Sequence, residues 1–202
     1  WGKNSIEVAY FDPNPKLANQ YFTVDEILNY SLKDANKRRG RDNSMINILP
    51  TRNFKINVDR NAVIQSGIVS PKDYEHIVNE IRFTIPDQSA LNRAELAFLN
   101  LLSIQQSTGW KRPVYIVDGI PNLGLDQWFM NHGTVRKFVP VQRPVVMQGL
   151  PEYVDIDESI KLFTETYTYG GASGDDIYYD EKNRILFLTY RNKTSQLART
   201  LA

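Results

Sequence analysis

The side chains best placed for chemistry lie between positions 110 and 140, beside predicted strands. Asp118 and Gly119 follow the apolar run Val114–Val117, and Asp126 and Trp128 stand in a short predicted helix after it. Ligands of open α/β sheets bind beyond the carboxyl ends of the strands, where loops face the solvent. A carboxylate, the backbone groups around a glycine and an aromatic ring suit a hydroxyl-rich ligand better than a phosphate. We therefore predict a ligand-binding site formed by Arg112, Asp118, Gly119, Asn122, Asp126, Trp128 and Arg136.

Two structural roles are alternatives to this site. Arg112 and Arg136 each place a charge next to a predicted buried strand, and a buried charge needs a partner. Ion pairs with Asp118 and Asp126 would satisfy both arginines without any ligand, and they are the commoner arrangement. Asp118 could also accept hydrogen bonds from neighbouring backbone amides in a tight turn, which is again the commoner role.

The histidines and glycines give little basis for catalysis. His76 and His132 fall in predicted helices and have no acidic or histidine partner at ligand spacing, so neither a metal site nor a serine-type triad is expected. We expect His132 to lie at a helix C-terminus, before Gly133. The glycine-rich run Gly170–Gly174 lacks the Lys-Ser/Thr ending of a phosphate-binding loop and is typical of a flexible turn.

Paired carboxylates offer one further route to catalysis. Asp175–Asp176 and Asp180–Glu181 could supply an acid and a base for glycosidic cleavage. Asp180 is, however, explained as the cap of a following helix, with Glu181 in its first turn. A hydrolase would need Asp175 and Asp180 to converge in one pocket. We therefore assign no catalytic residue, no metal and no cofactor to this chain.

Composition restricts the partners of the chain. Its 202 residues are 42% apolar and include no cysteine, which excludes disulfides and thiolate sites. A net charge of +1 gives no global attraction to nucleic acid or to an anionic membrane, and the basic run Lys37–Arg41 is typical of a solvated loop. No apolar stretch approaches the roughly 20 residues of a membrane helix. We expect a soluble piece of a longer protein, which begins before Trp1 and does not bind nucleic acid.

Hydrophobic periodicity predicts the secondary structure. Thr23 with Glu26, and Asn92 with Glu95, have the spacing of capping boxes and mark two helix starts. The predicted strands are Ile6–Phe11 at a sheet edge, Met45–Leu49, Phe54–Val58, Ile81–Ile85, Val114–Val117 as the buried central strand, and Val135–Val141. The predicted helices are Val24–Leu32, one starting at Ser70–Pro71, Leu96–Ile104 packed across the central strand, Leu125–Asn131, Ile156–Tyr167 and Glu181–Leu201.

These elements predict an α/β fold with a mixed sheet, flanking helices and a helical C-terminal extension. We place residues 1–145 in an α/β domain and residues 146–202 in a helical extension packed on it, with one single domain as the alternative. The final helix is expected to bury a stripe formed by Leu186, Tyr190, Leu197 and Leu201.

A series of motifs resembles a known family over roughly residues 21–202. The motifs are Phe54–Asp59, Trp110–Tyr115, Leu123–Trp128, Gly133–Pro140, Tyr169–Gly171 leading to Ile177–Glu181, and Arg191 followed by Leu197–Ala198. Their order resembles the soluble C-terminal region of the polytopic membrane proteins catalogued as domain of unknown function 2723, which are similar to protein O-mannosyltransferases. The family more often has Ile and Phe where Val114 and Ile116 stand, and Tyr where Trp128 stands.

The resemblance implies a function for the larger protein. Members of such a family would transfer a sugar from a lipid-linked donor to protein, and their acidic catalytic residue is expected in a loop of the membrane region, so none is carried over here. The chain is then expected to be a non-catalytic, extracytoplasmic (periplasmic) domain of a membrane glycosyltransferase, which positions acceptor or substrate. Its partners would be the membrane-embedded part of the same polypeptide and a protein or glycan acceptor. The aromatics expected to stack on sugar rings are Trp110, Trp128, Tyr169, Tyr178 and Tyr179.

A second interpretation comes from a different class of function. The chain would be a structural module that docks the membrane region onto helical repeats that follow it. This interpretation predicts an exposed apolar stripe on the last helix, around Leu186, Leu197 and Leu201.

Overall fold

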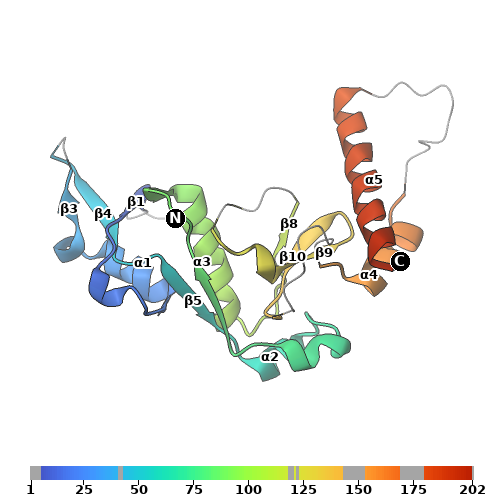
Figure 1. Ribbon diagram of the computed structural model, residues 1–202, viewed down its shortest axis with the longest axis horizontal. Coiled ribbons are helices and arrows are strands. Elements are labelled where there is room, and N and C mark those ends of the chain that lie inside the picture. The colour runs from blue at the N-terminus through green and yellow to red at the C-terminus, as the bar shows by residue number, and fades with distance from the viewer. Residues whose placement is uncertain are drawn as a thin grey trace. The chain divides into compact units, whose positions relative to one another are not determined.

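A computed structural model describes residues 6–40, 43–117, 121, 123–142, 153–168 and 180–201 (Figure 1). These residues form an α/β structure with mixed and antiparallel sheets, flanking helices and a long C-terminal helix, which confirms the predicted fold class. The chain divides into two compact units. The first unit comprises residues 1–114, 120–128 and 140–142, and the second unit comprises residues 115–119, 129–139 and 143–202. The boundary that the sequence suggests near residue 145 stays a prediction.

Two sheets form the frame of the first unit. One has the strand order β3-β4-β1-β7, in which β1 runs parallel to β4 and antiparallel to β7. The other has the order β2-β5-β6, in which β2 runs parallel to β5 and β6 antiparallel to it. The strands are β1 (Val8–Phe11), β2 (Phe22–Thr23), β3 (Arg38–Arg39), β4 (Met45–Leu49), β5 (Asn53–Asn57), β6 (Glu80–Thr84) and β7 (Ala90–Asn92).

Two helices of the first unit begin where the sequence places their caps, whereas the helix predicted to start at Ser70–Pro71 is only a 3-10 turn without a side-chain cap. In α1 (Val24–Leu32) the Thr23 hydroxyl accepts a hydrogen bond from the Glu26 amide at 3.2 Å, and a Glu26 carboxylate oxygen accepts one from the Thr23 amide at 2.8 Å. Asn92 and Glu95 form the same capping box at α3 (Arg93–Ser107). Both predicted capping boxes are confirmed. A capping box depends only on groups three residues apart, so the local sequence is enough to predict it. The remaining helical segments of this unit are α2 (Arg60–Ser66) and the short 3-10 turns η1 (Pro15–Leu17), η2 (Asp34–Asn36), η3 (Pro71–His76) and η4 (Asp126–Trp128).

The core of the first unit lies between these helices and the sheets. Helix α1 packs against α3 and β4, and α3 also contacts β5 and β7. The rings of Phe54 and Phe83 stack with their centroids 5.6 Å apart, and Trp110 and Trp128 are buried. Further buried side chains of this core are Val24, Ile27, Leu49, Leu91, Leu96, Leu99 and Leu102.

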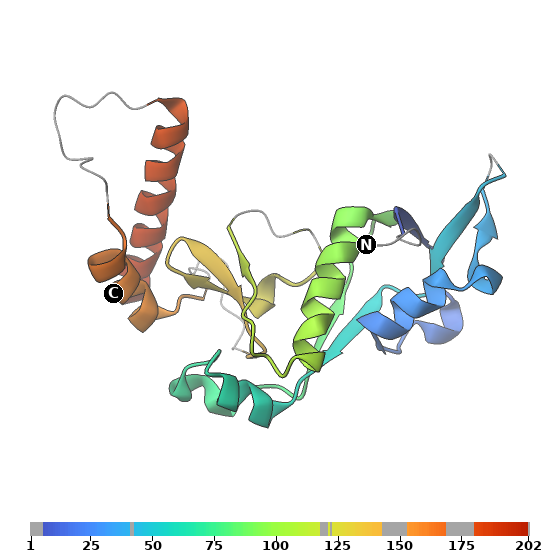
Figure 2. The ribbon, with the colours of Figure 1, turned by 180° about the vertical axis from the view of Figure 1, so that it is seen from behind.

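The second unit combines an antiparallel sheet with helices. Its sheet has the order β8-β10-β9, with β8 (Tyr115–Ile116), β9 (Phe129–His132) and β10 (Val135–Phe138). Its helical segments are α4 (Ile156–Lys161), the π-helical turn η5 (Leu162–Thr166) and α5 (Glu181–Leu201). In both views the C-terminal half of α5 lies beside α4, and its N-terminal half extends beyond α4 (Figures 1 and 2).

Three strand predictions are wrong in ways that share a cause. The run Val114–Val117 is not a buried central strand, because only Tyr115–Ile116 pair, at the sheet edge, and Val117 is 80% exposed. Conversely, β1 lies inside its sheet between β4 and β7, where an edge strand was expected. The strand predicted to reach Val141 ends at Phe138, and residues 140–142 pair with residues 76–78 of the first unit. Sheet position depends on distant partners, which a local pattern does not contain.

The helix predicted over Leu125–Asn131 is also wrong. The segment forms the single turn η4 and then strand β9. His132 pairs with Val135, so Gly133 and Thr134 form a two-residue hairpin turn, and Gly133 has φ +61°. Glycine with positive φ is favoured both after a helix and in a hairpin turn, so Gly133 in the sequence is compatible with either structure. His132 therefore lies on a strand and not at a helix C-terminus.

Candidate functional site

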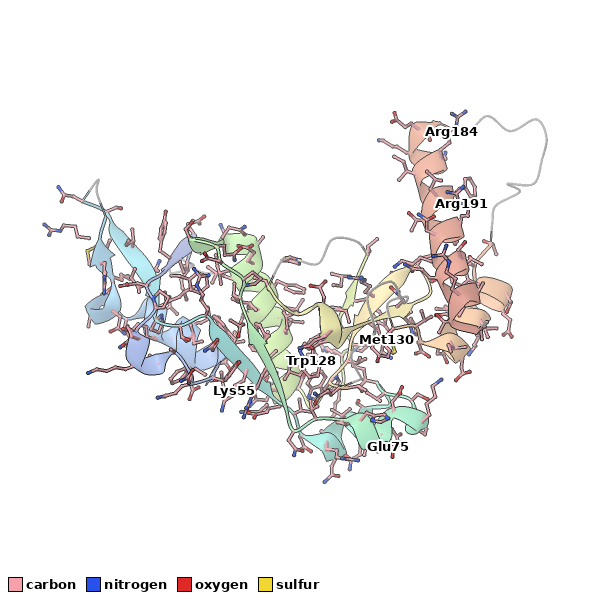
Figure 3. All side chains as sticks on the ribbon, viewed as in Figure 1. Lys55, Glu75, Trp128, Met130, Arg184 and Arg191 are labelled. Atoms are coloured by element: carbon pink, nitrogen blue, oxygen red, sulfur yellow. The ribbon has the colours of Figure 1, made fainter. Side chains whose placement is uncertain are left out.

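The predicted ligand site is only partly described by the structure. Asp118, Gly119 and Asn122 lie outside the described residues. Asp126 is exposed on η4, and Arg112 is exposed after α3, whereas the Trp128 ring is buried in the first unit (Figure 3). Arg136 belongs to the second unit, where it is half-buried on β10 between Ile116 and Asn131 of the neighbouring strands. The site as a whole, and the proposed arginine–aspartate pairs, stay predictions.

The other sequence candidates have mixed outcomes. Trp110 and Trp128 fill the core of the first unit, and Tyr169, Tyr178 and Tyr179 lie outside the described residues. Asp175 lies outside them as well. Asp180 does cap α5, because its carboxylate accepts a hydrogen bond from the Asn183 amide at 2.8 Å.

Sequence reasoning missed a polar cluster in the second unit, which we call the His132 cluster (Tyr115, His132, Lys137, Asp155 and Glu158). A segment before α4 runs parallel to β9, with hydrogen bonds from the Asn131 amide to the Tyr153 carbonyl (2.6 Å) and from the Asp155 amide to the Asn131 carbonyl (2.8 Å). This pairing brings Asp155 Oδ2 to 3.5 Å from His132 Nδ1. His132 therefore has an acidic partner that does not stand at ligand spacing in the sequence, because Asp155 lies 23 residues away.

The strands of the sheet complete this cluster. Tyr115 on β8 pairs in register with Lys137 on β10, and the Tyr115 ring lies 5.4 Å from the His132 ring, centroid to centroid. Lys137 is only 8% exposed. Tyr115 is exposed, so one aromatic face of the cluster meets the solvent.

The charged groups of the cluster shift one another's pKa values. Burial alone would raise the pKa of Asp155, but the His132 ring, the Lys137 charge and the Glu158 amide outweigh it and hold that pKa below its ordinary value. Burial lowers the pKa of Lys137, although the carboxylates of Asp155 and Glu158 oppose that shift. Burial and the same two carboxylates raise the pKa of Tyr115. Asp155 is therefore a stabilising anion among groups that would otherwise be costly to bury.

Asn131 connects this region to α5. It is buried, its Oδ1 accepts a hydrogen bond from Lys193 Nζ at 2.8 Å, and its Nδ2 donates one to Gln196 Oε1 at 3.4 Å. Leu197 is also buried, and the Tyr190 ring meets the Tyr167 ring edge-on at 5.6 Å. The C-terminal half of α5 is thus fixed to the second unit by both polar and apolar contacts.

The N-terminal half of α5 exposes large apolar side chains, which we call the α5 apolar end (Ile185, Leu186 and Leu188). Their exposed fractions are 57%, 52% and 46%, whereas that of Leu197 is 7%. The expected burial of Leu186 and Leu201 is therefore wrong, since both are exposed, while the burial of Leu197 is confirmed. Exposed apolar groups gathered on one element are typical of an interaction surface.

Two further features are absent from the described part of the chain. No group of three or more side chains there is arranged to hold a metal ion. Of the helices described, none is both long and apolar enough to cross a membrane.

The fold and these surfaces define an α/β structure whose last helix exposes large apolar side chains in its N-terminal half. Residues 2–158 match the model of the family called TMEM260-associated domain 2, so the chain belongs to that family. This membership fits a domain associated with a membrane protein. No curated protein and no solved structure shows a significant match to the chain.

Proposed function

We propose that this chain is a non-catalytic accessory domain of a TMEM260-related membrane protein, and that it docks onto another part of that parent protein. The observation that carries the proposal is the α5 apolar end. Three large apolar side chains are about half exposed on a helix whose other half is firmly held by the second unit. Burying them against a partner would be favourable, at about 25 cal/mol per Å² of apolar surface removed from water.

Hydrogen exchange tests this proposal directly. Backbone amides of residues 185–188 should exchange more slowly in the full-length parent than in the isolated chain, because docking would bury them. Amides around Leu197 serve as the internal control, since the second unit already covers them in both samples. Equal exchange at residues 185–188 in the two proteins would rule out docking through this end.

A second proposal is that the domain positions an acceptor or substrate for a glycosyltransferase on the extracytoplasmic, periplasmic side of the membrane. The parent would then belong to the polytopic family of domain of unknown function 2723, similar to protein O-mannosyltransferases. The exposed Tyr115 ring beside Asp155 and His132 supports this proposal, because an aromatic face next to polar groups suits a sugar ring.

Binding to a glycan and peptide array tests the positioning proposal. The intact chain should bind a subset of glycans or peptides, and Tyr115→Ala should abolish that binding. Tyr10→Ala, which removes an exposed tyrosine of the first unit, is the matched control and should bind like the wild type. Silence of the wild-type chain at millimolar ligand would count against the proposal.

A further inference from the structure

Lys137 combines burial with a missing contact. The residue is only 8% exposed, yet in the described part of the chain its ammonium donates no hydrogen bond and forms no ion pair. The carboxylates of Asp155 and Glu158 act on it through charge alone. The ammonium is not fully enclosed, unlike the Nδ1 atom of His132, so a ligand can reach it. Buried polar groups are normally hydrogen-bonded, and an exception indicates a role beyond the fold itself.

The charge of Lys137 also lowers the stability of the fold. Burial lowers the pKa of Lys137 in spite of the two nearby carboxylates, which means that the folded state disfavours the charged amine. At a pH below both the folded and the unfolded pKa, the residue therefore makes an unfavourable contribution to folding. Methionine, which has a similar length and no charge, would avoid this contribution. Side chains that oppose folding in this way are typical of functional sites.

Tyr115 and Glu158 lie close to Lys137. Tyr115 on β8 is in register with Lys137 on β10, and paired residues of neighbouring strands point to the same side of a sheet (Figures 1 and 2). The Tyr115 ring is exposed and lies beside the His132 ring. Glu158 on α4 is exposed, and its charge acts on both Lys137 and Tyr115. This region therefore offers an aromatic surface, a hydrogen-bond donor and a carboxylate acceptor.

The charges of the cluster select the class of ligand. Asp155 and Glu158 carry two negative charges, which balance Lys137 and would balance even a protonated His132. No excess positive charge is therefore left to attract a phosphate or an acidic sugar. A neutral sugar fits, because its C–H face can stack on an aromatic ring and one hydroxyl can accept a hydrogen bond from an ammonium and donate another to a carboxylate. A trans peptide group points its N–H and C=O in opposite directions and cannot serve both at one point.

We propose that Tyr115, Lys137 and Glu158 form a binding site for a neutral sugar. The apolar face of the sugar ring stacks on Tyr115, and one hydroxyl accepts a hydrogen bond from Lys137 Nζ and donates one to the Glu158 carboxylate. This inference rests on the positioning function proposed above, and it adds the class of sugar and the two residues that recognise it.

A glycan array with matched acidic sugars tests the class of ligand. The intact chain is applied to neutral hexose glycans, to the corresponding uronic-acid glycans and to peptides. We expect binding to neutral glycans alone. In titration calorimetry the best neutral glycan should bind at least about tenfold more tightly than its uronic-acid counterpart, because the carboxylates of the cluster repel the acid.

Lys137→Met tests the role of the ammonium. The variant removes the donor, so it should bind the best neutral glycan about tenfold more weakly than the wild type. Its free energy of unfolding in denaturant should equal or exceed that of the wild type, because a buried charge is removed. Lys182→Met makes the same change at an exposed position of the second unit and should alter neither quantity.

Glu158→Gln tests the selection against acidic sugars. The variant removes one of the two repelling carboxylates, so the preference for the neutral glycan over the uronic acid should shrink. An unchanged preference would refute the argument from charge.

The remaining outcomes separate this inference from the positioning function. Tighter binding of uronic acids would make Lys137 part of an anion site, and binding of peptides alone would identify a peptide surface. Loss of both stability and binding in Lys137→Met would give the residue a structural role. If Lys137→Met bound neutral glycans like the wild type while Tyr115→Ala did not, the inference would be wrong and the positioning function would stand. Silence of the wild-type chain toward all of these ligands would refute both.

Discussion

Asp155 joins the segment before α4 to the hairpin of β9 and β10, so replacing it with asparagine should destabilise the second unit. Asparagine keeps the shape of the side chain but removes the negative charge that faces His132 and Lys137. The Asp155 and His132 side chains are only 9% and 15% exposed, and Lys137 is buried. The charge therefore acts where water screens it weakly.

The size of the effect follows from this burial. Removing one partner of a fully buried ion pair costs about 3–5 kcal/mol, and losing a hydrogen bond to a charged group costs about 1.5–3 kcal/mol. Glu158 remains as a second carboxylate near Lys137, and asparagine can still contact His132. We therefore expect Asp155→Asn to lower the free energy of unfolding by about 2 kcal/mol at neutral pH.

The pH dependence provides a sharper test. The folded-state pKa of Asp155 lies below its ordinary value of 3.8, so its contribution to stability is present above the unfolded-state pKa and is lost as the pH falls through the folded-state pKa. The difference between wild type and Asp155→Asn should thus shrink as the pH falls below about 4.

Denaturant unfolding followed by far-ultraviolet circular dichroism measures this difference, because α5 contributes a large helical signal to the second unit. Glu165→Gln removes an exposed carboxylate of the same unit and should change the free energy of unfolding by less than about 0.5 kcal/mol. If Asp155→Asn behaved like Glu165→Gln, or if its effect did not diminish in acid, the assigned role of Asp155 would be wrong.

Two further pairs of variants test the packing. Gly124→Ala should lower the free energy of unfolding by more than about 2 kcal/mol, because Gly124 has φ +71° and an added Cβ would lie 2.4 Å from the Thr84 carbonyl oxygen. Gly67 has a similar φ, but an added Cβ there meets open space, so Gly67→Ala should cost only about 1 kcal/mol. Thermal unfolding monitored by tryptophan fluorescence compares the two variants. On α5, Leu197→Ala should lower the free energy of unfolding by about 3 kcal/mol and Leu186→Ala by less than about 1 kcal/mol, because Leu197 is buried and Leu186 is exposed. Equal losses in denaturant unfolding would contradict this difference in burial.

The starts of three helices were determined by the sequence itself, although the helix predicted over Leu125–Asn131 was wrong and α2 was not predicted. The starts of α1, α3 and α5 follow from Thr23, Asn92 and Asp180, whose side chains bond to amides no more than three residues away. Such contacts form within one turn, so the local order of residue types is enough to specify them.

Tertiary structure decided the sheets and the polar cluster. Whether Val114–Val117 becomes a central strand or a short edge depends on β10, and whether Gly133 ends a helix or turns a hairpin depends on the pairing of β9 with β10. The contact of His132 with Asp155 likewise exists because a segment 23 residues away runs beside β9. Side chains so far apart in the chain become neighbours only through backbone pairing, which has no fixed spacing in the sequence.

In α5, the sequence determined the helix itself, whereas the tertiary structure decided which of its residues are buried. Its bounds and its apolar residues could be predicted, and Leu186 and Leu197 stand on the same face, about three turns apart. From the sequence, both leucines were therefore expected to be buried. The second unit, through Asn131 and the aromatic rings beside Tyr190, covers the half that holds Leu197 and leaves Leu186 exposed, because burial depends on where other elements pack and not on the residue itself.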